Sequence, residues 1–108
     1  DVRTTLMIRN IPNAMTLMQL KALLDRIIPG KYDFLYLRMD FRSRQNVGYA
    51  FINLQSAVFI EDLYVIHGRT WTVGMPSMTT KVCMLCYATI QGRDGLIENF
   101  RNSAVMLE

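Results

Sequence analysis

The order of its predicted strands and helices constrains the fold of this chain more than any other feature. Four short segments are rich in β-branched and aromatic residues, which favour strands, and two amphipathic helical segments lie between them. We predict strands at residues 5–9, 32–39, 47–54 and 81–90. Each helix has an apolar stripe that needs burial, so both helices are expected to cover the same face of one sheet.

Both helices have recognisable beginnings and ends. Thr16 is a good N-cap for the first, and Gln19 lies three residues later, as a capping box requires. The apolar residues at helical spacing behind this cap are Leu20, Leu23, Leu24 and Ile27. Pro29 and the glycine after it end that helix. Ser56 caps the second helix and Gly68 is its expected end. The apolar side of the second helix consists of Phe59, Leu63 and Ile66.

The resulting order, β-α-β-β-α-β, is the ferredoxin-like pattern. We therefore predict an α+β domain, a ferredoxin-like sandwich with a four-stranded antiparallel sheet. Residues 91–108 form a predicted helical extension, with a third helix from Arg93 to about Asn102. The apolar side of this C-terminal helix consists of Leu96, Ile97 and Phe100. The second face of the sheet is left open unless this helix covers it.

Length and composition are those of one small globular domain. The chain has 108 residues, of which 51% are hydrophobic and 19% charged. It begins at Asp1 without an initiator methionine, so we interpret residues 1–108 as a single domain of a longer protein. The formal net charge of +3 permits an anionic partner without demanding one. The apolar runs are too short to span a bilayer, and no signal-peptide pattern is present. We expect no membrane partner and an intracellular location, in the nucleus, the cytoplasm or both.

Two cysteines, Cys83 and Cys86, have the C-x-x-C spacing that suits zinc or a redox dithiol. A structural zinc needs four ligands, and His67 is the only histidine. The pair also lies in a predicted strand, where residues three apart point to opposite faces. We therefore expect two reduced thiols and no metal or cofactor.

Strand alternation divides the side chains of the sheet into two sets. The set assigned to the helix-covered face is Leu6, Ile8, Leu35, Leu37, Met39, Ala50, Ile52, Leu54, Cys83, Leu85 and Tyr87. The set assigned to the open face is Met7, Arg9, Phe34, Tyr36, Arg38, Tyr49, Phe51, Asn53, Met84, Cys86 and Ala88. Four aromatic rings are therefore expected on the open face.

An exposed aromatic patch of this size usually marks a binding site. Rings interleaved with arginines suit unpaired nucleobases, because each base offers a π-face and stacking is worth about 1–3 kcal/mol per base. Arginine supplies phosphate contacts and a stacking plane of its own. In the alternative interpretation, the third helix buries this face permanently as a second small core.

Two of the strands resemble the signature strands of the RNA recognition motif. The third-strand signature, K/R-G-F/Y-G/A-F-V-x-F/Y, is matched by VGYAFINL at residues 47–54. Val47 replaces the basic residue and Leu54 the final aromatic. The first-strand signature resembles LMIRNI at residues 6–11, except that Met7 stands where an aromatic stacker is usual. The two motifs in this order of elements imply the fold and the RNA-binding sheet of that family.

Four stretches carry a closer resemblance: RTTLMIRNIPN, YDFLYLRMDF, NVGYAFIN and YATIQGRDGLIENFRNS. They resemble the C-terminal RNA recognition motif of the Mei-two-like proteins, meiosis-regulating RNA-binding proteins of fungi and plants. The resemblance covers nearly the whole chain, including the tail beyond the fourth strand. It implies single-stranded RNA binding, a regulatory RNA partner, a role in meiosis, and an essential Phe51.

From the fold and the resemblance together we assign expected roles. Phe51 is expected to stack under one base, Tyr49 to pack against a sugar, and Met7 to make a weaker contact in place of a second ring. Phe34 and Tyr36 are expected to compensate from the second strand. The candidates for phosphate or base-edge contacts are Arg9, Arg38, Arg42, Arg44, Lys81 and Asn53. The isolated domain is expected to be monomeric, with protein partners possible.

Two other functions compete with this one. Peptide-binding variants of the same fold hold a partner's tryptophan between the helices, with an arginine-x-aromatic motif before the last strand. The segment Arg69-x-Trp71 resembles that motif, but the first helix has only Asp25 as an acid, and Tyr49 and Phe51 are retained. We therefore favour RNA and expect Trp71 to anchor its loop to the domain. An enzyme is disfavoured, because no paired carboxylates, nucleophile–base constellation or metal cluster is visible in the sequence.

Overall fold

The computed structural model describes residues 2–71 and 79–101. The strands are β1 (Thr5–Arg9), β2 (Tyr32–Met39), β3 (Asn46–Leu54) and β4 (Met84–Tyr87). The helices are α1 (Leu17–Ile27), α2 (Ile60–Leu63) and α3 (Arg93–Phe100). Two 3-10 turns, η1 (Ala57–Phe59) and η2 (Tyr64–Ile66), extend α2 at its two ends. Part of the connection at 69–80, which leads to the last strand, and the end of the predicted C-terminal extension lie outside the described residues.

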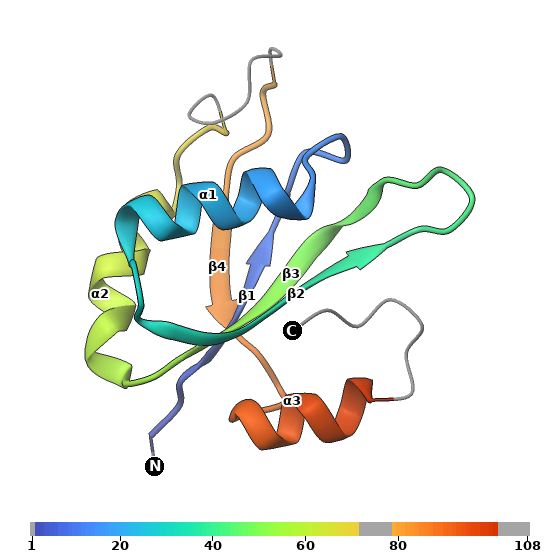
Figure 1. The fold of residues 1–108 in the computed structure, drawn as a ribbon. Coiled ribbons are helices and arrows are strands. Elements are labelled where there is room, and N and C mark those ends of the chain that lie inside the picture. Colours follow the sequence, from blue (N-terminus) through green and yellow to red (C-terminus); the bar gives the residue numbers. More distant parts are fainter. Residues whose placement is uncertain (1, 72–78, 102–108) are drawn as a thin grey trace.

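The strands form one antiparallel sheet in the order β2-β3-β1-β4. Both α1 and α2 lie against one face of this sheet, and α3 lies on the opposite side (Figure 1). The predicted ferredoxin-like sandwich with an extra C-terminal helix is therefore confirmed. No helix in the described parts of the chain is long and apolar enough to cross a membrane.

The capping signals of α1 act as the sequence indicates. The Thr16 hydroxyl accepts a hydrogen bond from the Gln19 backbone N–H at 3.1 Å, and the Gln19 side chain accepts one from the Thr16 N–H at 2.9 Å. These bonds satisfy two of the donors that every helix start leaves unpaired. The helix ends at Ile27, and Gly30 takes a left-handed conformation with φ of 70° in the turn that follows.

The second helical segment is less regular than predicted. Only Ile60–Leu63 is α-helical, and the turns on both sides are 3-10. Its sequence, AVFIEDLYVI, is rich in β-branched and aromatic residues, which lose side-chain freedom in an α-helix. Burial of Leu63 and Ile66 nevertheless places the segment against the sheet.

The main core lies between the sheet and these helices. It contains the predicted aliphatic faces of α1 and of the strands, and also Trp71, whose side chain is 2% exposed. The expectation that Trp71 anchors its loop to the domain is therefore confirmed. Its indole Nε1 is buried and has no hydrogen-bond partner among the described residues.

The last strand is shorter than predicted, and two side chains at its end differ in exposure from what their predicted faces suggest. Tyr87, predicted to be inside, is 45% exposed, with the Arg3 guanidinium 3.9 Å from its ring centre. Ala88, predicted to be outside, is 8% exposed. The chain leaves the sheet at this point, where the Ala88 N–H donates to the Thr5 carbonyl at 3.1 Å. Tyr87 is the register partner of Leu6, so it lies on the predicted face but at an uncovered edge. Ala88 lies beyond the end of β4, where period-two alternation no longer applies.

Candidate nucleic-acid interface

The face opposite α1 and α2 is organised in rows that run across the strands. One row consists of Tyr36, Phe51, Met7 and Cys86, which are register partners from β2 to β4. Tyr36 is fully buried, Phe51 and Met7 are partly exposed, and Cys86 is exposed. Exposure therefore increases from the β2 edge of the sheet towards the β4 edge.

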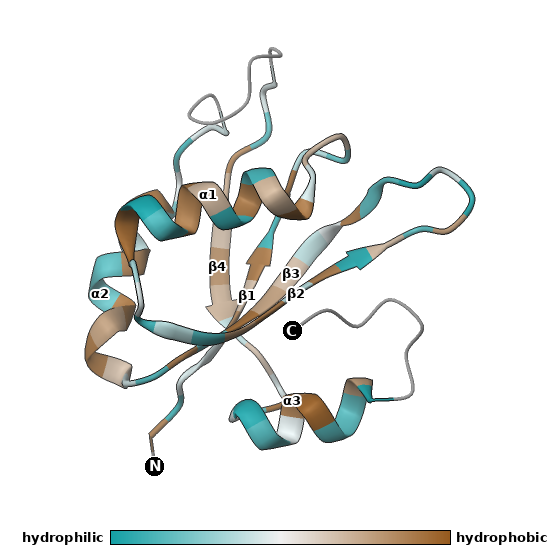
Figure 2. Ribbon diagram, viewed as in Figure 1, coloured by the Kyte–Doolittle hydropathy of each residue, from teal (hydrophilic) through white to brown (hydrophobic). Residues whose placement is uncertain are grey.

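The burial at the β2 edge is caused by α3. Leu96 and Phe100 pack on Phe34 and Tyr36 in a second hydrophobic cluster, with Phe51 at its margin. The Phe100 ring lies 4.5 Å from Tyr36 and 5.3 Å from Phe51, measured between ring centroids. In Figure 2, hydrophobic and hydrophilic segments alternate along α3, as expected of a helix that packs by one side.

Two expected RNA-contacting aromatics are therefore not on an open surface. Phe34 is 3% exposed and Tyr36 is fully buried, so the prediction that they replace the missing second stacker is wrong. The strand period correctly placed both rings on the face away from α1. The strand period could not show that the third helix covers this half of the face. The alternative interpretation, in which the third helix buries the whole face, is therefore correct for the β2 half only.

A hydrogen-bond network fixes the start of α3 on β1 and β3. The Asn53 side-chain oxygen Oδ1 accepts from the hydroxyls of Thr4 and Thr5 at 2.8 and 2.7 Å, and its side-chain nitrogen Nδ2 donates to the Asp33 carboxylate at 2.8 Å. The Gly92 N–H donates to the Thr5 hydroxyl at 2.8 Å. Asn53 is 4% exposed and its polar atoms are engaged. The prediction that it reads base edges is therefore not supported, because its side-chain oxygen and nitrogen already make hydrogen bonds within the domain.

Gln91 completes this attachment. Its side-chain oxygen accepts from the N–H groups of Thr4 and Thr5, both at 3.0 Å. Its side-chain nitrogen donates to the carbonyls of Thr5 and Ala88 at 2.9 and 2.8 Å. The amide thus continues the hydrogen bonding of β4 along β1 after β4 has ended. This is why the chain turns at residue 92, where Gly92 has a φ of 88°, and enters α3 over the sheet.

The part of the face that α3 leaves open lies over β3, β1 and β4. Tyr49 and Phe51 are partly exposed, and their rings meet edge to face with centroids 5.8 Å apart. Met7 is partly exposed, and Arg9, the register partner of Tyr49, is exposed. These four predicted residues are brought together, and we call them the open sheet surface.

A polar pocket of about 370 Å³ adjoins the open sheet surface. Its lining residues are Arg9, Asn10, Asn13, Val47, Gly48, Tyr49 and Lys81. The Lys81 ammonium group donates to the Asn13 side-chain oxygen at 3.0 Å, which orients it at the pocket. Arg9 and Lys81, predicted separately as phosphate contacts, are therefore brought to one place. Two cations beside a partly exposed tyrosine provide charge and a stacking surface together.

Asn46 holds the framework of this pocket. It is 2% exposed, its side-chain amide donates to the carbonyls of Pro12 and Met15 at 2.8 Å each, and its side-chain oxygen accepts from the Gly48 N–H at 2.8 Å. The loop between β1 and α1 is thereby tied to the start of β3. Sequence reasoning did not include Asn10 or Asn13 in the site. Their position in the turn directly after Arg9 was the signal that could have indicated them.

The remaining predicted cations lie elsewhere. Arg38 is exposed near the end of β2, and Arg42 and Arg44 are exposed in the loop between β2 and β3; none of the three lines the polar pocket. The loop also contains Asp40, whose carboxylate accepts from the Ser43 hydroxyl at 2.8 Å. The Ser43 hydroxyl and N–H hold the pKa of Asp40 below its usual value, so this loop carries a negative charge as well.

The two cysteines face different environments. Cys83 is buried in the main core, where burial raises the pKa of its thiol to about 12, and Cys86 is exposed on the sheet. Within the described ranges no group of three or more His, Cys, Asp or Glu side chains could hold a metal ion.

A four-stranded sheet backed by two helices, with Tyr49 and Phe51 on one of its two central strands, is the architecture of an RNA recognition motif. The chain belongs to this family, because residues 3–101 match RNA recognition motif 2. It is 49% identical over 109 residues to Protein MEI2-like 2 of Oryza sativa subsp. japonica, and 49% identical over 114 residues to Meiosis protein mei2 of Schizosaccharomyces pombe. All of this chain is aligned in both cases, but it spans only 12% and 14% of those proteins. The resemblance to the Mei-two-like proteins is therefore confirmed.

Solved structures agree on the fold. The RNA recognition motif of RNA15 matches 82% of this chain and 92% of its own, with a TM-score of 0.63 and 17% identity. RNA recognition domains 1 and 2 of Sex-lethal from Drosophila melanogaster match 79% of this chain and 49% of their own, with a TM-score of 0.61 and 26% identity. A Sex-lethal protein/RNA complex and RNA15 with bound RNA also match, at TM-scores of 0.61 and 0.64. At these low identities the matches establish the RNA recognition motif fold.

Proposed function

We propose that this domain binds single-stranded RNA on the open sheet surface and in the polar pocket beside it. One observation carries the proposal: Tyr49 and Arg9 pair across β3 and β1 and both line that pocket with Lys81. Membership of the RNA recognition motif family and the similarity to MEI2-like proteins support an RNA ligand.

The mechanism combines stacking with charge. A base stacks on the exposed part of Tyr49 or Phe51, which is worth about 1–3 kcal/mol per base. The phosphate next to that base enters the polar pocket, where Arg9 and Lys81 neutralise it. Met7 contributes an apolar contact between β3 and β4. No step of this mechanism is catalytic.

The position of α3 limits how much RNA the sheet can take. Because α3 covers Phe34 and Tyr36, the β2 side offers no ring for a base. The bound strand is therefore expected to follow β3, β1 and β4, where Met84 is 41% exposed and Cys86 is exposed. Such a surface suits two or three bases, which is the usual number stacked on the sheet of this module.

The decisive experiment compares two tyrosines. Tyr49→Ala removes the ring at the polar pocket, and Tyr64→Ala removes a ring that is 50% exposed on the helical side. Binding of a labelled single-stranded RNA should weaken by about tenfold in the first variant and remain unchanged in the second, because one lost stacking contact is worth about 1–3 kcal/mol. Thermal melts accompany both. Equal affinities of Tyr49→Ala and wild type would refute the proposal.

The names of the relatives suggest the biological setting of the RNA. We extend the proposal to a regulatory RNA that acts in meiosis, with this domain as the part of the protein that binds single-stranded RNA. The protein is proposed to act in the nucleus, the cytoplasm or both. Ultraviolet crosslinking of the full-length protein in meiotic cells tests this extension. The crosslinked RNA should be lost in Tyr49→Ala, and unchanged crosslinking in that variant would show that another part of the protein selects the RNA.

A further inference from the structure

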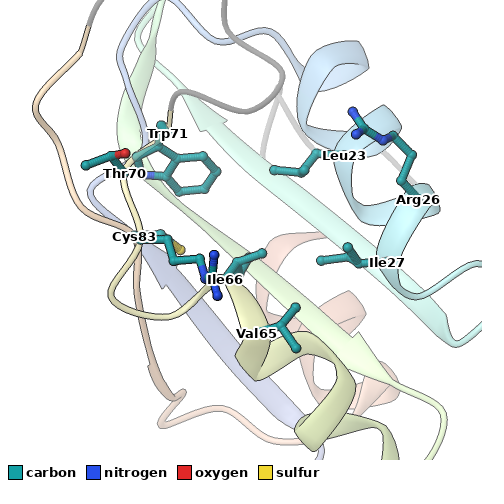
Figure 3. Close-up of a pocket in the computed structure, with 9 residues that line it drawn as sticks. Leu23, Arg26, Ile27, Val65, Ile66, Thr70, Trp71 and Cys83 are labelled. Carbon is teal, nitrogen blue, oxygen red and sulfur yellow. The ribbon is translucent and has the colours of Figure 1, made fainter.

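A second pocket lies on the helical side of the domain, away from the open sheet surface. It has a volume of about 340 Å³ and lies between α1 and the segment from η2 to Thr70 and Trp71. Figure 3 shows Leu23 and Ile27 of α1 on one side of it, with Trp71 and Ile66 across from them. Its lining residues are Leu23, Arg26, Ile27, Val65, Ile66, Arg69, Thr70, Trp71 and Cys83.

The walls of this helical-side pocket are mostly apolar, and its size limits what can enter. Small-molecule pockets are usually about 300–1,000 Å³, so 340 Å³ is at the lower end and suits a single large side chain. Val65, at the rim, is 54% exposed, which adds apolar surface outside the pocket. A large apolar side chain that enters such a pocket is the usual anchor of a protein–protein contact.

Two arginines add a charge requirement. Arg26 and Arg69 both line the pocket and are exposed. In the parts of the chain that the structure describes, no hydrogen bond or ion pair joins either guanidinium group to another residue. An apolar pocket with two unpaired cations at its edge is complementary to an apolar side chain that has carboxylates beside it.

We propose that the helical-side pocket binds an acidic peptide segment of a partner protein, which inserts one large apolar side chain between α1 and Trp71 and places carboxylates on Arg26 and Arg69. This is a function separate from RNA binding, and the predicted Arg69-x-Trp71 element forms part of the site. A second copy of this domain is a poorer occupant, because each copy has a formal net charge of +3. An RNA base is a poorer occupant of walls that offer few polar partners.

The chain provides its own probe, because Trp71 is its only tryptophan and lines the pocket. The experiment titrates the domain with a short peptide that has a central phenylalanine flanked by glutamates, and follows the emission of Trp71. A saturable change is expected. A peptide with alanine in place of the phenylalanine should bind about 30-fold more weakly, since it lacks an anchor worth about 2 kcal/mol. A peptide flanked by lysines should bind roughly tenfold more weakly than the peptide flanked by glutamates, because both exposed charge contacts are reversed.

Charge-reversal variants locate the contact. Arg26→Glu and Arg69→Glu should each lower the affinity for the acidic peptide by roughly two- to fivefold, as expected for exposed ion pairs. Arg42→Glu makes the same charge change in the loop between β2 and β3, outside the pocket lining, and should leave peptide affinity unchanged. Single-stranded RNA should still bind Arg26→Glu, so this readout separates the pocket from the sheet.

Several results would overturn the proposal. Equal affinities for the phenylalanine and alanine peptides would show that no large side chain enters the pocket. An equal loss of affinity in Arg42→Glu would show that the peptide responds only to the net charge of the domain. If RNA changes Trp71 emission and competes with the peptide, the pocket belongs to an RNA site. If emission depends on the concentration of the domain alone, the occupant is a second copy. Melting curves of each variant distinguish lost contacts from lost folding, and wild-type titrations decide the outcome if a variant does not fold.

Discussion

At the scale of single residues, Phe51 belongs to two environments. One neighbour is the Phe100 ring of α3, 5.3 Å away between centroids, and the other is Tyr49, at 5.8 Å. Removing Phe51 therefore damages the second hydrophobic cluster as well as the stacking surface. Tyr49, which lines the polar pocket and lies outside that cluster, gives a cleaner test of base stacking.

The two thiols give a prediction at the same scale. Cys86 should react with a maleimide at neutral pH, whereas Cys83 should react only after unfolding, because it is buried and its pKa is raised to about 12. Mass spectrometry of the native and the urea-unfolded domain measures this. Bound single-stranded RNA should slow the labelling of Cys86, the register partner of Met7. Rapid labelling of Cys83 in the native domain would contradict the packing of the main core.

At the scale of secondary structure elements, the sequence predicted the elements themselves but not which of their side chains are exposed at the site. The caps of α1, the order of the strands and the assignment of side chains to the two faces in β1, β2 and β3 follow from local patterns, so they could be predicted. The burial of Phe34 and Tyr36 depends on where α3 lies, and periodicity shows that a helix has an apolar side without showing what that side covers.

The polar network under α3 was equally hidden from sequence reasoning. Asn53 stands at a position of the signature strand that alternates towards RNA, and its type suits base recognition. Its actual partners are Thr4, Thr5 and Asp33, which are distant in sequence. Hydrogen bonds between such residues leave no periodic signal. The same limit applies to the polar pocket, whose Lys81 comes from a segment far along the chain from Asn13.

This network predicts how α3 is held. Asn53→Leu keeps the approximate size of the side chain but leaves the Thr4 and Thr5 hydroxyls and the Asp33 carboxylate without their partner. The free energy of unfolding should fall by about 1–3 kcal/mol, the usual cost of unsatisfied buried groups. Urea unfolding measures it, and hydrogen exchange should accelerate in α3 before it does in α1.

A matched control is available on the same strand end. Gln55→Leu also replaces an amide, but Gln55 is exposed and its side chain has no hydrogen bond to another described residue. Its stability should remain within about 0.5 kcal/mol of wild type. Similar losses in both variants would mean that the Asn53 network does not hold α3.

At the scale of the whole molecule, the sheet separates two surfaces of different chemistry. The open sheet surface and its polar pocket lie on one side, and the mostly apolar helical-side pocket lies among α1, η2 and Trp71 on the other. Because the main core lies between them, a ligand on one side does not occupy the site of the other. The two proposed ligands, an RNA and an acidic peptide, are therefore expected not to exclude each other.

The salt dependence of RNA binding tests the electrostatic side of this arrangement. The sequence indicates five candidate phosphate contacts, Arg9, Arg38, Arg42, Arg44 and Lys81, but the structure places only Arg9 and Lys81 at the polar pocket. Each neutralised phosphate of a single strand contributes about −0.7 to the slope of log K against log salt. Two contacts predict a slope of about −1.4, and five predict about −3.5.

We expect the lower of these two magnitudes, measured by fluorescence anisotropy of a short RNA over a series of potassium chloride concentrations. Lys81→Ala should reduce the magnitude of the slope by about 0.7, and Arg42→Ala, which removes a cation outside the polar pocket, should leave it unchanged. A slope near −3.5 that decreases in both variants would show that RNA also follows the loop between β2 and β3. A flat response would contradict phosphate binding in the polar pocket itself, because neutralising a phosphate must release counterions wherever it occurs.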